Sequence, residues 1–99
     1  MNGPTVKYPD GFRVTRLPAG SAAGLTWLVF IVEGRDISVK WYYHERMTFI
    51  DASGDEIETF GGGGGNDELW LDHLSLKERT FTIRYHWGGE QLLEEHIAL

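Results

Sequence analysis

Four histidines are the residues of this sequence that most readily suggest metal chemistry, because imidazole is a common metal ligand. They are His44, His73, His86 and His96. Their spacing does not follow an H-x-H, H-x3-H or H-E-x-x-H pattern. We therefore expect no metal site and interpret the histidines as polar, solvent-facing positions. The sequence also contains no cysteine, which excludes a thiolate nucleophile, a disulfide and a Cys-ligated metal.

Carboxylates are plentiful and could, in pairs, carry acid–base chemistry or hold calcium. Acid–base catalysis needs a partly buried carboxyl with a raised pKa, whereas these acids stand in turns, beside glycines or at outward strand positions. The segment Asp51–Glu56 resembles a calcium loop, but its glycine stands at the fourth position and not at the sixth. We interpret it as a polar hairpin turn. No G-x-S-x-G sequence marks a nucleophilic serine, so we expect neither an enzyme nor a cofactor.

Five consecutive glycines, Gly61–Gly65, invite comparison with a phosphate-binding loop. Such a loop needs a following Lys and Ser or Thr, whereas Asn66, Asp67 and Glu68 follow here, and these acids would repel phosphate. Each glycine inside a regular element costs about 0.5–1 kcal/mol relative to alanine. We therefore predict a mobile glycine loop over residues 61–66, able to become ordered on contact with a partner.

Outward aromatic residues are the clearest binding signal, because tyrosine contributes interface area at low entropic cost. In one predicted strand, alternation places Trp41 and Tyr43 in the core and Tyr42 and His44 on the outer face. Trp70 also faces outward if the segment around it is a strand. These outward side chains are candidates for contact with a partner.

A run of acids without any Lys or Arg extends from residue 51 to residue 72. It contains Asp51, Asp55, Glu56, Glu58, Asp67, Glu68 and Asp72. If the fold gathers them, they form a negative patch that attracts a basic partner. The chain of 99 residues has 9 Lys plus Arg against 15 Asp plus Glu, a net charge of −6, which argues against direct binding of nucleic acid.

Membrane and export signals are weak in this sequence. The longest apolar run, Leu25–Val32, has eight residues, whereas a membrane helix needs about 20. The opening residues Met1–Pro4 lack the basic and apolar regions of a secretory signal. We expect no membrane partner and a cytoplasmic location, with which the absence of cysteine is compatible.

The elements that must position these residues are short apolar segments separated by Gly, Asp, Asn or Pro, a pattern typical of all-β proteins. A chain of this length forms one domain, residues 1–99, with an irregular N-terminal arm over residues 1–11. We predict a two-sheet antiparallel sandwich, immunoglobulin-like in architecture, with seven or eight short strands. Residues 66–76 and the C-terminal segment remain open between a strand and a short helix. Alternation predicts further strands at Phe12–Leu17, Leu25–Glu33, Ile37–His44, Met47–Ile50, Ile57–Phe60 and Thr80–Trp87.

The strand predicted at Leu25–Glu33 is apolar on both faces. One face carries Trp27, Val29 and Ile31, and the other carries Leu28, Phe30 and Val32. A strand that is apolar on both sides is covered on both sides. A homodimer that uses the face of Leu28, Phe30 and Val32 is one way to provide that cover.

The last two segments are predicted to form a hairpin around Gly88–Gly89. A three-residue loop with a bulge pairs Tyr85 with Leu93 and leaves Glu95 as the one acid that faces inward. A two-residue loop would instead place Glu94 inside the core, because a one-residue slip turns every side chain to the other face. We therefore prefer the three-residue loop.

Taken together, these features favour a small, acidic, non-catalytic protein-binding domain, such as an inhibitor, an immunity-type neutraliser or an adaptor. Its expected partner is a protein with a basic surface. The predicted contact residues are Tyr42, His44, Asp55, Glu56, Glu58, Asp67, Glu68, Trp70 and Asp72. The alternatives are a carbohydrate- or calcium-binding β module and a homo-oligomeric structural domain.

Overall fold

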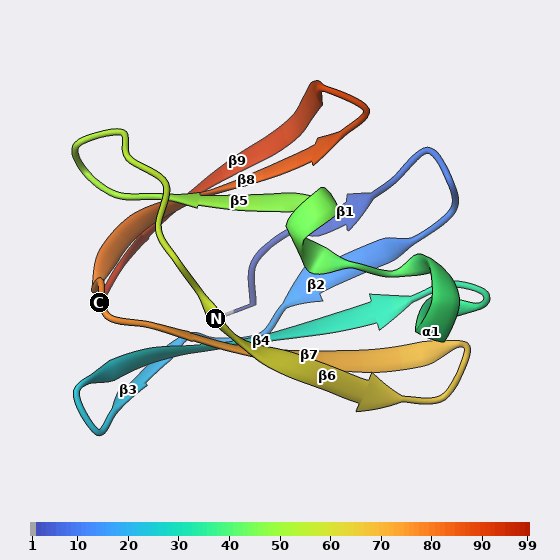
Figure 1. Cartoon of the computed structure of the whole chain (residues 1–99), viewed down its shortest axis with the longest axis horizontal. Coiled ribbons are helices and arrows are strands. Elements are labelled where there is room, and N and C mark those ends of the chain that lie inside the picture. The colour runs from blue at the N-terminus through green and yellow to red at the C-terminus, as the bar shows by residue number, and fades with distance from the viewer. Residues whose placement is uncertain (1) are drawn as a thin grey trace.

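A computed structural model describes residues 2–99, and in them nine strands form two antiparallel sheets (Figure 1). The larger sheet contains β1 (Thr5–Lys7), β2 (Arg13–Arg16), β3 (Gly20–Ala22), β4 (Leu25–Glu33), β6 (Phe60–Gly65) and β7 (Leu69–Leu76). The smaller sheet contains β5 (Met47–Ile50), β8 (Thr80–Trp87) and β9 (Glu90–Ala98). The predicted two-sheet antiparallel sandwich is confirmed, and the two ambiguous segments are the strands β7 and β9. The finer likeness to an immunoglobulin arrangement stays a prediction.

The strand order determines which edges are open. In the larger sheet the order is β1-β2-β4-β7-β6, and β3 pairs with β4 beyond the end of β2. In the smaller sheet the order is β5-β8-β9. Strands β6 and β5 are therefore edge strands, and the chain passes between them from one sheet to the other (Figure 1). Within residues 2–99 no helix is long and apolar enough to cross a membrane.

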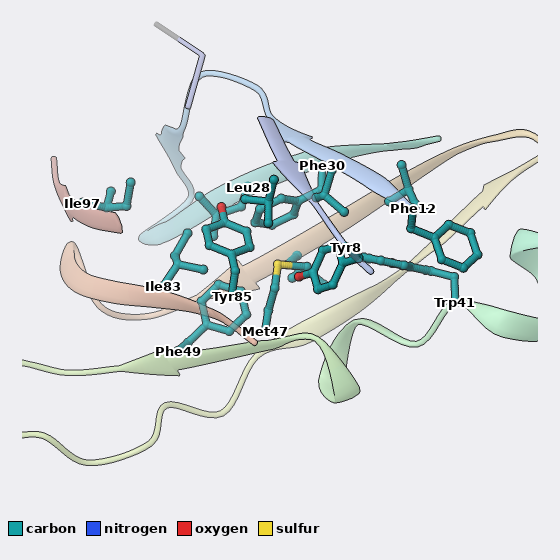
Figure 2. Close-up of a cluster of buried hydrophobic side chains, with 14 of the residues drawn as sticks. Tyr8, Phe12, Leu28, Phe30, Trp41, Met47, Phe49, Ile83, Tyr85 and Ile97 are labelled. Atoms are coloured by element: carbon teal, nitrogen blue, oxygen red, sulfur yellow. The ribbon is translucent and has the colours of Figure 1, made fainter. Parts of the chain in front are cut away.

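The core lies between the sheets and is lined by the inward face of β4. Leu28, Phe30 and Val32 have no exposed surface, and the Phe30 ring lies 6.5 Å from the Phe49 ring of β5 (Figure 2). The homodimer face predicted from Leu28, Phe30 and Val32 is therefore wrong, because the smaller sheet already covers it. The opposite face of β4, which includes Trp27, is the one left without cover.

The predicted strand over residues 37–44 is wrong. The segment forms one helical turn, α1 (Ile37–Lys40), and a 3-10 turn, η1 (Tyr43–Glu45). Ile37 and Trp41 are buried as expected, but Val39 is 70% exposed. Residues four apart lie on the same face of a helix and also of a strand, so Ile37 and Trp41 fit both structures. Only Val39 distinguishes the two.

The predicted hairpin between residues 47–50 and residues 57–60 forms only at its turn, where the Asp51 N–H donates to Asp55 O at 2.9 Å and the Ile57 N–H donates to Phe49 O at 2.7 Å. A single bridge joins Ile50 to Glu56. After Ile57 the chain leaves the smaller sheet, and at Phe60 it enters the edge of the larger one (Figure 1). This crossing segment, and not a second hairpin arm, forms one wall of the site described below.

The predicted mobile glycine loop over residues 61–66 is wrong as well. Gly61–Gly65 belong to β6, which pairs with β7 from the Phe60–Ser75 pair to the Gly65–Trp70 pair. At Gly61 and Gly65 the backbone φ is positive, at 152° and 155°, and an added Cβ would collide with a backbone oxygen of β7. Glycine is therefore required at these positions, because only a residue without a Cβ allows the two backbones to approach so closely.

The register predicted for the last hairpin is confirmed. Tyr85 pairs with Leu93, and Arg84 pairs with Glu94. The loop itself has only the two residues between Trp87 and Glu90, and the extra residue is taken up by a bulge in the ladder beyond Tyr85. The bulge therefore turns the same side chains of β9 inward as the predicted three-residue loop would have done.

The one acid predicted to face inward, Glu95, forms an ion pair between the sheets. Arg16 of β2 donates from Nε to Glu95 Oε1 at 2.8 Å and from Nη2 to Oε2 at 2.9 Å. The Tyr85 hydroxyl donates to Glu95 Oε1 at 3.2 Å. The hydrogen bond to Glu95 raises the pKa of Arg16, and burial raises the pKa of Tyr85. The pair is a bidentate link across the core.

Candidate functional site

Two neighbouring depressions lie beside the segments that connect the sheets, and His44 lines both. The first, which we name the aromatic hollow, has a volume of about 240 Å³ and is lined by Ser38, Trp41, Tyr42, Tyr43, His44, Gly62, Gly63, Trp70 and Asp72. The second, which we name the acidic groove, has a volume of about 500 Å³ and is lined by His44, Met47, Thr48, Phe49, Glu56, Ile57, Glu58 and Thr59.

A buried carboxylate holds the two tryptophans of the aromatic hollow. Asp72 on β7 is 3% exposed. Trp41, which follows α1, donates its indole N–H to Asp72 Oδ2 at 2.5 Å. Trp70, two residues before Asp72 on the same strand, donates its indole N–H to Asp72 Oδ1 at 2.9 Å. The carboxylate therefore fixes the orientation of both rings, and a charge-assisted hydrogen bond is stronger than a neutral one.

The glycines of β6 keep this arrangement open. A Cβ at Gly63 would collide with Asp72 Oδ1 and with Trp70 Nε1, so any side chain there would break the hydrogen bond between them. A Cβ at Gly62 would meet no atom within 4 Å. Because β6 carries no side chains here, the hollow stays unfilled.

The rim of the hollow is formed by η1 and α1. Tyr42 is 58% exposed. Tyr43 stacks on His44 with 3.9 Å between the ring centroids, and its hydroxyl lies 3.1 Å from Thr59 Oγ1. The Ser38 hydroxyl donates to the Asp67 carboxylate in the turn between β6 and β7. These contacts attach the rim to the crossing segment on one side and to the β6–β7 turn on the other.

Negative charge in the lining is the main electrostatic feature of the site. Glu56 and Glu58 are exposed in the acidic groove, and Asp72 lies in the wall of the hollow. Among the described residues, neither depression is lined by a Lys or an Arg. A cleft lined by charge of one sign raises the local concentration of oppositely charged ligands.

The structure gathers some of the predicted contact residues and separates others. Tyr42, His44, Trp70 and Asp72 line the hollow, and Glu56 and Glu58 line the groove. The turn after β5, which holds Asp55, and the turn between β6 and β7, which holds Asp67 and Glu68, lie at opposite ends of the molecule (Figure 1). Whether the acids of residues 51–72 form one patch was left open by the sequence, and the fold does not gather them into one.

Two contact residues have a different environment from the one predicted. Asp72 is buried, and Trp70 is half-buried against the core, whereas both were expected to face solvent. The outward side chains of β7 are Leu69 and Leu71, at 49% and 37% exposure. The face of β7 was assigned the wrong way round, because an acid stands on the inward face and leucines stand on the outward face.

Sequence reasoning missed part of the lining. Trp41 and Tyr43 were assigned only to the core, and the glycine strand was assigned to a loop. The one available signal was the glycine run itself, because glycine inside a strand marks a place where another group approaches closely.

The histidines and the aspartate turn behave as ordinary polar groups. His86 Nε2 lies 2.8 Å from Thr48 Oγ1. Asp51 Oδ1 accepts the backbone N–H groups of Ser53 and Asp55 at 2.9 and 3.0 Å, as in a common Asx-type turn. In the part of the chain that the structure describes, no group of three or more His, Asp or Glu side chains could hold a metal ion. That the protein works without metal stays an expectation.

Behind the hollow, Trp41 also takes part in a buried cation site that no sequence pattern indicated. Arg46 is 1% exposed, and its guanidinium carbon lies 4.9 Å from the Trp41 ring centroid. Three further rings lie at 4.5–5.1 Å, those of Tyr8, Phe12 and Trp87. Arg46 donates to both carboxylate oxygens of Asp10, at 3.0 and 2.6 Å. Figure 2 shows Tyr8, Phe12 and Trp41 together at this end of the core.

No known protein family, curated protein or solved structure matches the chain. The hollow and the groove are therefore the features from which a function can be inferred. That chemistry combines fixed aromatic rings, exposed tyrosine and uncompensated carboxylates, which are features of a surface that binds a cationic partner.

Proposed function

We propose that this chain is a small, non-catalytic protein-binding domain whose partner presents a basic surface to the aromatic hollow and the acidic groove. One observation carries the proposal: exposed Tyr42 lines the hollow and exposed His44 lines both depressions, which within residues 2–99 contain carboxylates and no lining Lys or Arg. Tyrosine is enriched at binding surfaces, and matched charge speeds association and selects partners.

The proposal covers an inhibitor, a neutraliser or an adaptor, in each case without a cofactor and without direct contact to nucleic acid or membrane. The net charge of −6 supports attraction to a basic protein. A cytoplasmic location belongs to the proposal, and the absence of cysteine is compatible with it. The carbohydrate alternative is less well supported, because Trp70 is half-buried and bonded to Asp72 and does not form an open platform.

The test is an affinity pull-down from the source organism's lysate with the full chain as bait, at low and at raised salt, followed by mass spectrometry. Three baits are compared: the unmodified chain, the double variant Glu56→Lys with Glu58→Lys, and the control Glu68→Lys with Glu90→Lys. Both double variants change the net charge equally, but the control residues are exposed and lie outside the hollow and the groove.

We expect a basic protein that is recovered at low salt, weakened at raised salt, lost with the Glu56/Glu58 variant and retained with the control. Recovery of no protein would contradict the proposal. Equal loss with both double variants would show that net charge alone is responsible, and that result would also overturn the assignment to this surface.

A second candidate function is self-association through the outer face of the larger sheet. On this face Trp27 is 42% exposed, Leu69 is 49% exposed and Phe60 is 53% exposed. The three side chains share the face because β4, β7 and β6 are neighbouring strands and the register turns these residues to the same side. The apolar centre of this face carries no carboxylate, so a second copy of this acidic chain meets no like charge at that centre.

A further inference from the structure

We propose that the aromatic hollow is a binding site for a guanidinium group, supplied by an arginine side chain of the basic partner. This inference rests on the proposed function and specifies which chemical group of the partner the site takes. It is argued from the charge of Asp72, from the rings around it, and from the size of the hollow.

Asp72 gives the hollow a charge that its own contacts do not neutralise. Each carboxylate oxygen accepts one indole N–H, from Trp41 and from Trp70, and both donors are uncharged. Within the described residues 2–99, no Lys or Arg lines the hollow. A buried carboxylate is unfavourable unless it is paired, so a cation placed here gains an interaction that the isolated protein lacks.

The rings and the size of the hollow favour a planar cation. Trp41, Trp70 and Tyr42 supply aromatic surface beside the carboxylate. Guanidinium is planar, weakly hydrated and suited to stacking on aromatic faces, whereas ammonium is compact and strongly hydrated. The volume of about 240 Å³ is below the ~300–1,000 Å³ typical of pockets for drug-sized ligands, and it suits a single side chain.

The same chain already holds a guanidinium in this type of environment. Arg46 lies among four aromatic rings at 4.5–5.1 Å and pairs with Asp10. Trp41 belongs both to that internal cage and to the wall of the hollow. In the internal cage the guanidinium is held by the four rings, by the Asp10 carboxylate and by the Lys40 backbone oxygen, which accepts from Nη2 at 3.4 Å.

The test is a titration of the purified chain, followed through the indole N–H signals of Trp41 and Trp70 in ¹⁵N–¹H spectra. The probes are N-acetyl-arginine amide, its neutral isostere N-acetyl-citrulline amide, N-acetyl-lysine amide, free L-arginine and glucose. We expect saturable shifts with the arginine amide, and affinities at least tenfold weaker for the other four probes. Free arginine has the same net charge as the amide, but it should bind more weakly because its ionised amino and carboxylate groups, which a residue within a protein lacks, must be partly dehydrated at the hollow.

Two variants and a control link binding to the hollow. Asp72→Asn keeps the shape of the side chain but removes the charge and replaces one of the two indole acceptors by an NH2 group. Tyr42→Ala removes an exposed ring without disturbing the core and leaves Asp72 unchanged. We expect each to weaken arginine amide binding by tenfold or more. Val39→Ala, 70% exposed and outside the hollow, should bind as the unmodified chain does.

The inference is overturned if the arginine amide causes no saturable shift, or if citrulline, lysine amide or glucose binds equally well. Tighter binding of free arginine would also overturn it, because the occupant would then be a metabolite and not a protein. Failure here remains distinct from failure of the proposed function. A basic partner captured through Glu56 and Glu58 without arginine amide binding contradicts this inference alone, and the reverse result contradicts only the proposed function.

Discussion

The glycine strand provides a sharp test of the site geometry, because two neighbouring glycines face opposite environments. A Cβ at Gly63 would collide with Asp72 Oδ1 and Trp70 Nε1 and would lie 2.7 Å from the Leu71 backbone oxygen. A Cβ at Gly62 meets no atom within 4 Å. Neither glycine has a positive φ, so alanine is compatible with both backbone conformations. Gly63→Ala and Gly62→Ala therefore differ only in what the new methyl group contacts.

The two substitutions are expected to change the free energy of unfolding in opposite directions. Gly63→Ala breaks the hydrogen bond that the Trp70 indole N–H donates to the Asp72 carboxylate. The loss of a buried hydrogen bond to a charged group lowers the free energy of unfolding by about 1.5–3 kcal/mol. Alanine restricts the unfolded chain and returns about 0.4–1 kcal/mol. The net loss is centred near 1.5 kcal/mol, which lowers the Tm of a domain of this size by about 6–12 °C. Gly62→Ala has only the favourable part and should raise the Tm by a few degrees.

The assay is urea unfolding followed by tryptophan fluorescence and by circular dichroism, with equal m-values required before the free energies of unfolding are compared. The Trp70 indole N–H signal provides a second readout, because it should move in Gly63→Ala and stay in place in Gly62→Ala. If Gly63→Ala is as stable as Gly62→Ala, the packing of Asp72 against β6 is refuted, and with it the reason for glycine at this position.

Three other features predict measurable effects. Arg16→Met leaves Glu95 buried without its partner and should lower the free energy of unfolding in urea by about 3–5 kcal/mol, whereas replacing both residues by Met should restore most of it. At Asp10, burial raises the carboxyl pKa, but the hydrogen bond and charge of Arg46 outweigh it and lower the pKa. The contribution of ionised Asp10 to the free energy of unfolding is therefore complete above the pKa that this carboxyl has in the unfolded chain, and it is lost as the pH falls through the lower pKa of the folded state. Asp10→Asn should accordingly lose less stability on acidification than the unmodified chain does. Trp27→Lys should shift any dimer to monomer in analytical ultracentrifugation, and an unchanged mass would exclude the outer face as the interface.

Alternation predicted the sandwich because most strands have one covered face. In β8 and β9 the register could be chosen from the position of a single acid, since the alternatives buried Glu94 or Glu95. Alternation placed Glu95 inward, yet nothing in the sequence showed that Arg16 is its partner. Their pairing depends on how the two sheets are stacked, which is a property of the tertiary structure.

The errors arose where one pattern fits two structures or where packing outweighs propensity. Ile37 and Trp41 are four residues apart, so their burial is the same for a helical turn and for a strand. Residues 61–65 have the lowest strand propensity in the chain, yet they pair with residues 70–74 of β7. Pairing with β7 compensates for the poor propensity, and a single sequence does not report that gain.

The same distinction explains how much of the site was found. Tyr42 and His44 were identified because both side chains are exposed whether the segment is a strand, as predicted, or a pair of turns, as observed. Asp72 was identified for the wrong reason, as a surface acid. Its carboxylate is stabilised inside the protein by two indole donors that come from different parts of the chain, and the sequence does not show that they meet it. A buried acid is indistinguishable from an exposed one until its donors are known.

The glycine run links stability to binding. Glycine in a strand costs about 0.5–1 kcal/mol per residue relative to alanine, and at Gly62 the structure offers no steric reason for that cost. At Gly63 glycine is needed to hold Asp72 and Trp70, whereas a side chain at Gly62, which pairs with His73, would point to the outer face of the sheet and away from the hollow. Gly62→Ala should therefore gain stability and leave binding at the hollow unchanged. Gly63→Ala should lose both stability and binding, because it displaces the two side chains that form the wall of the hollow.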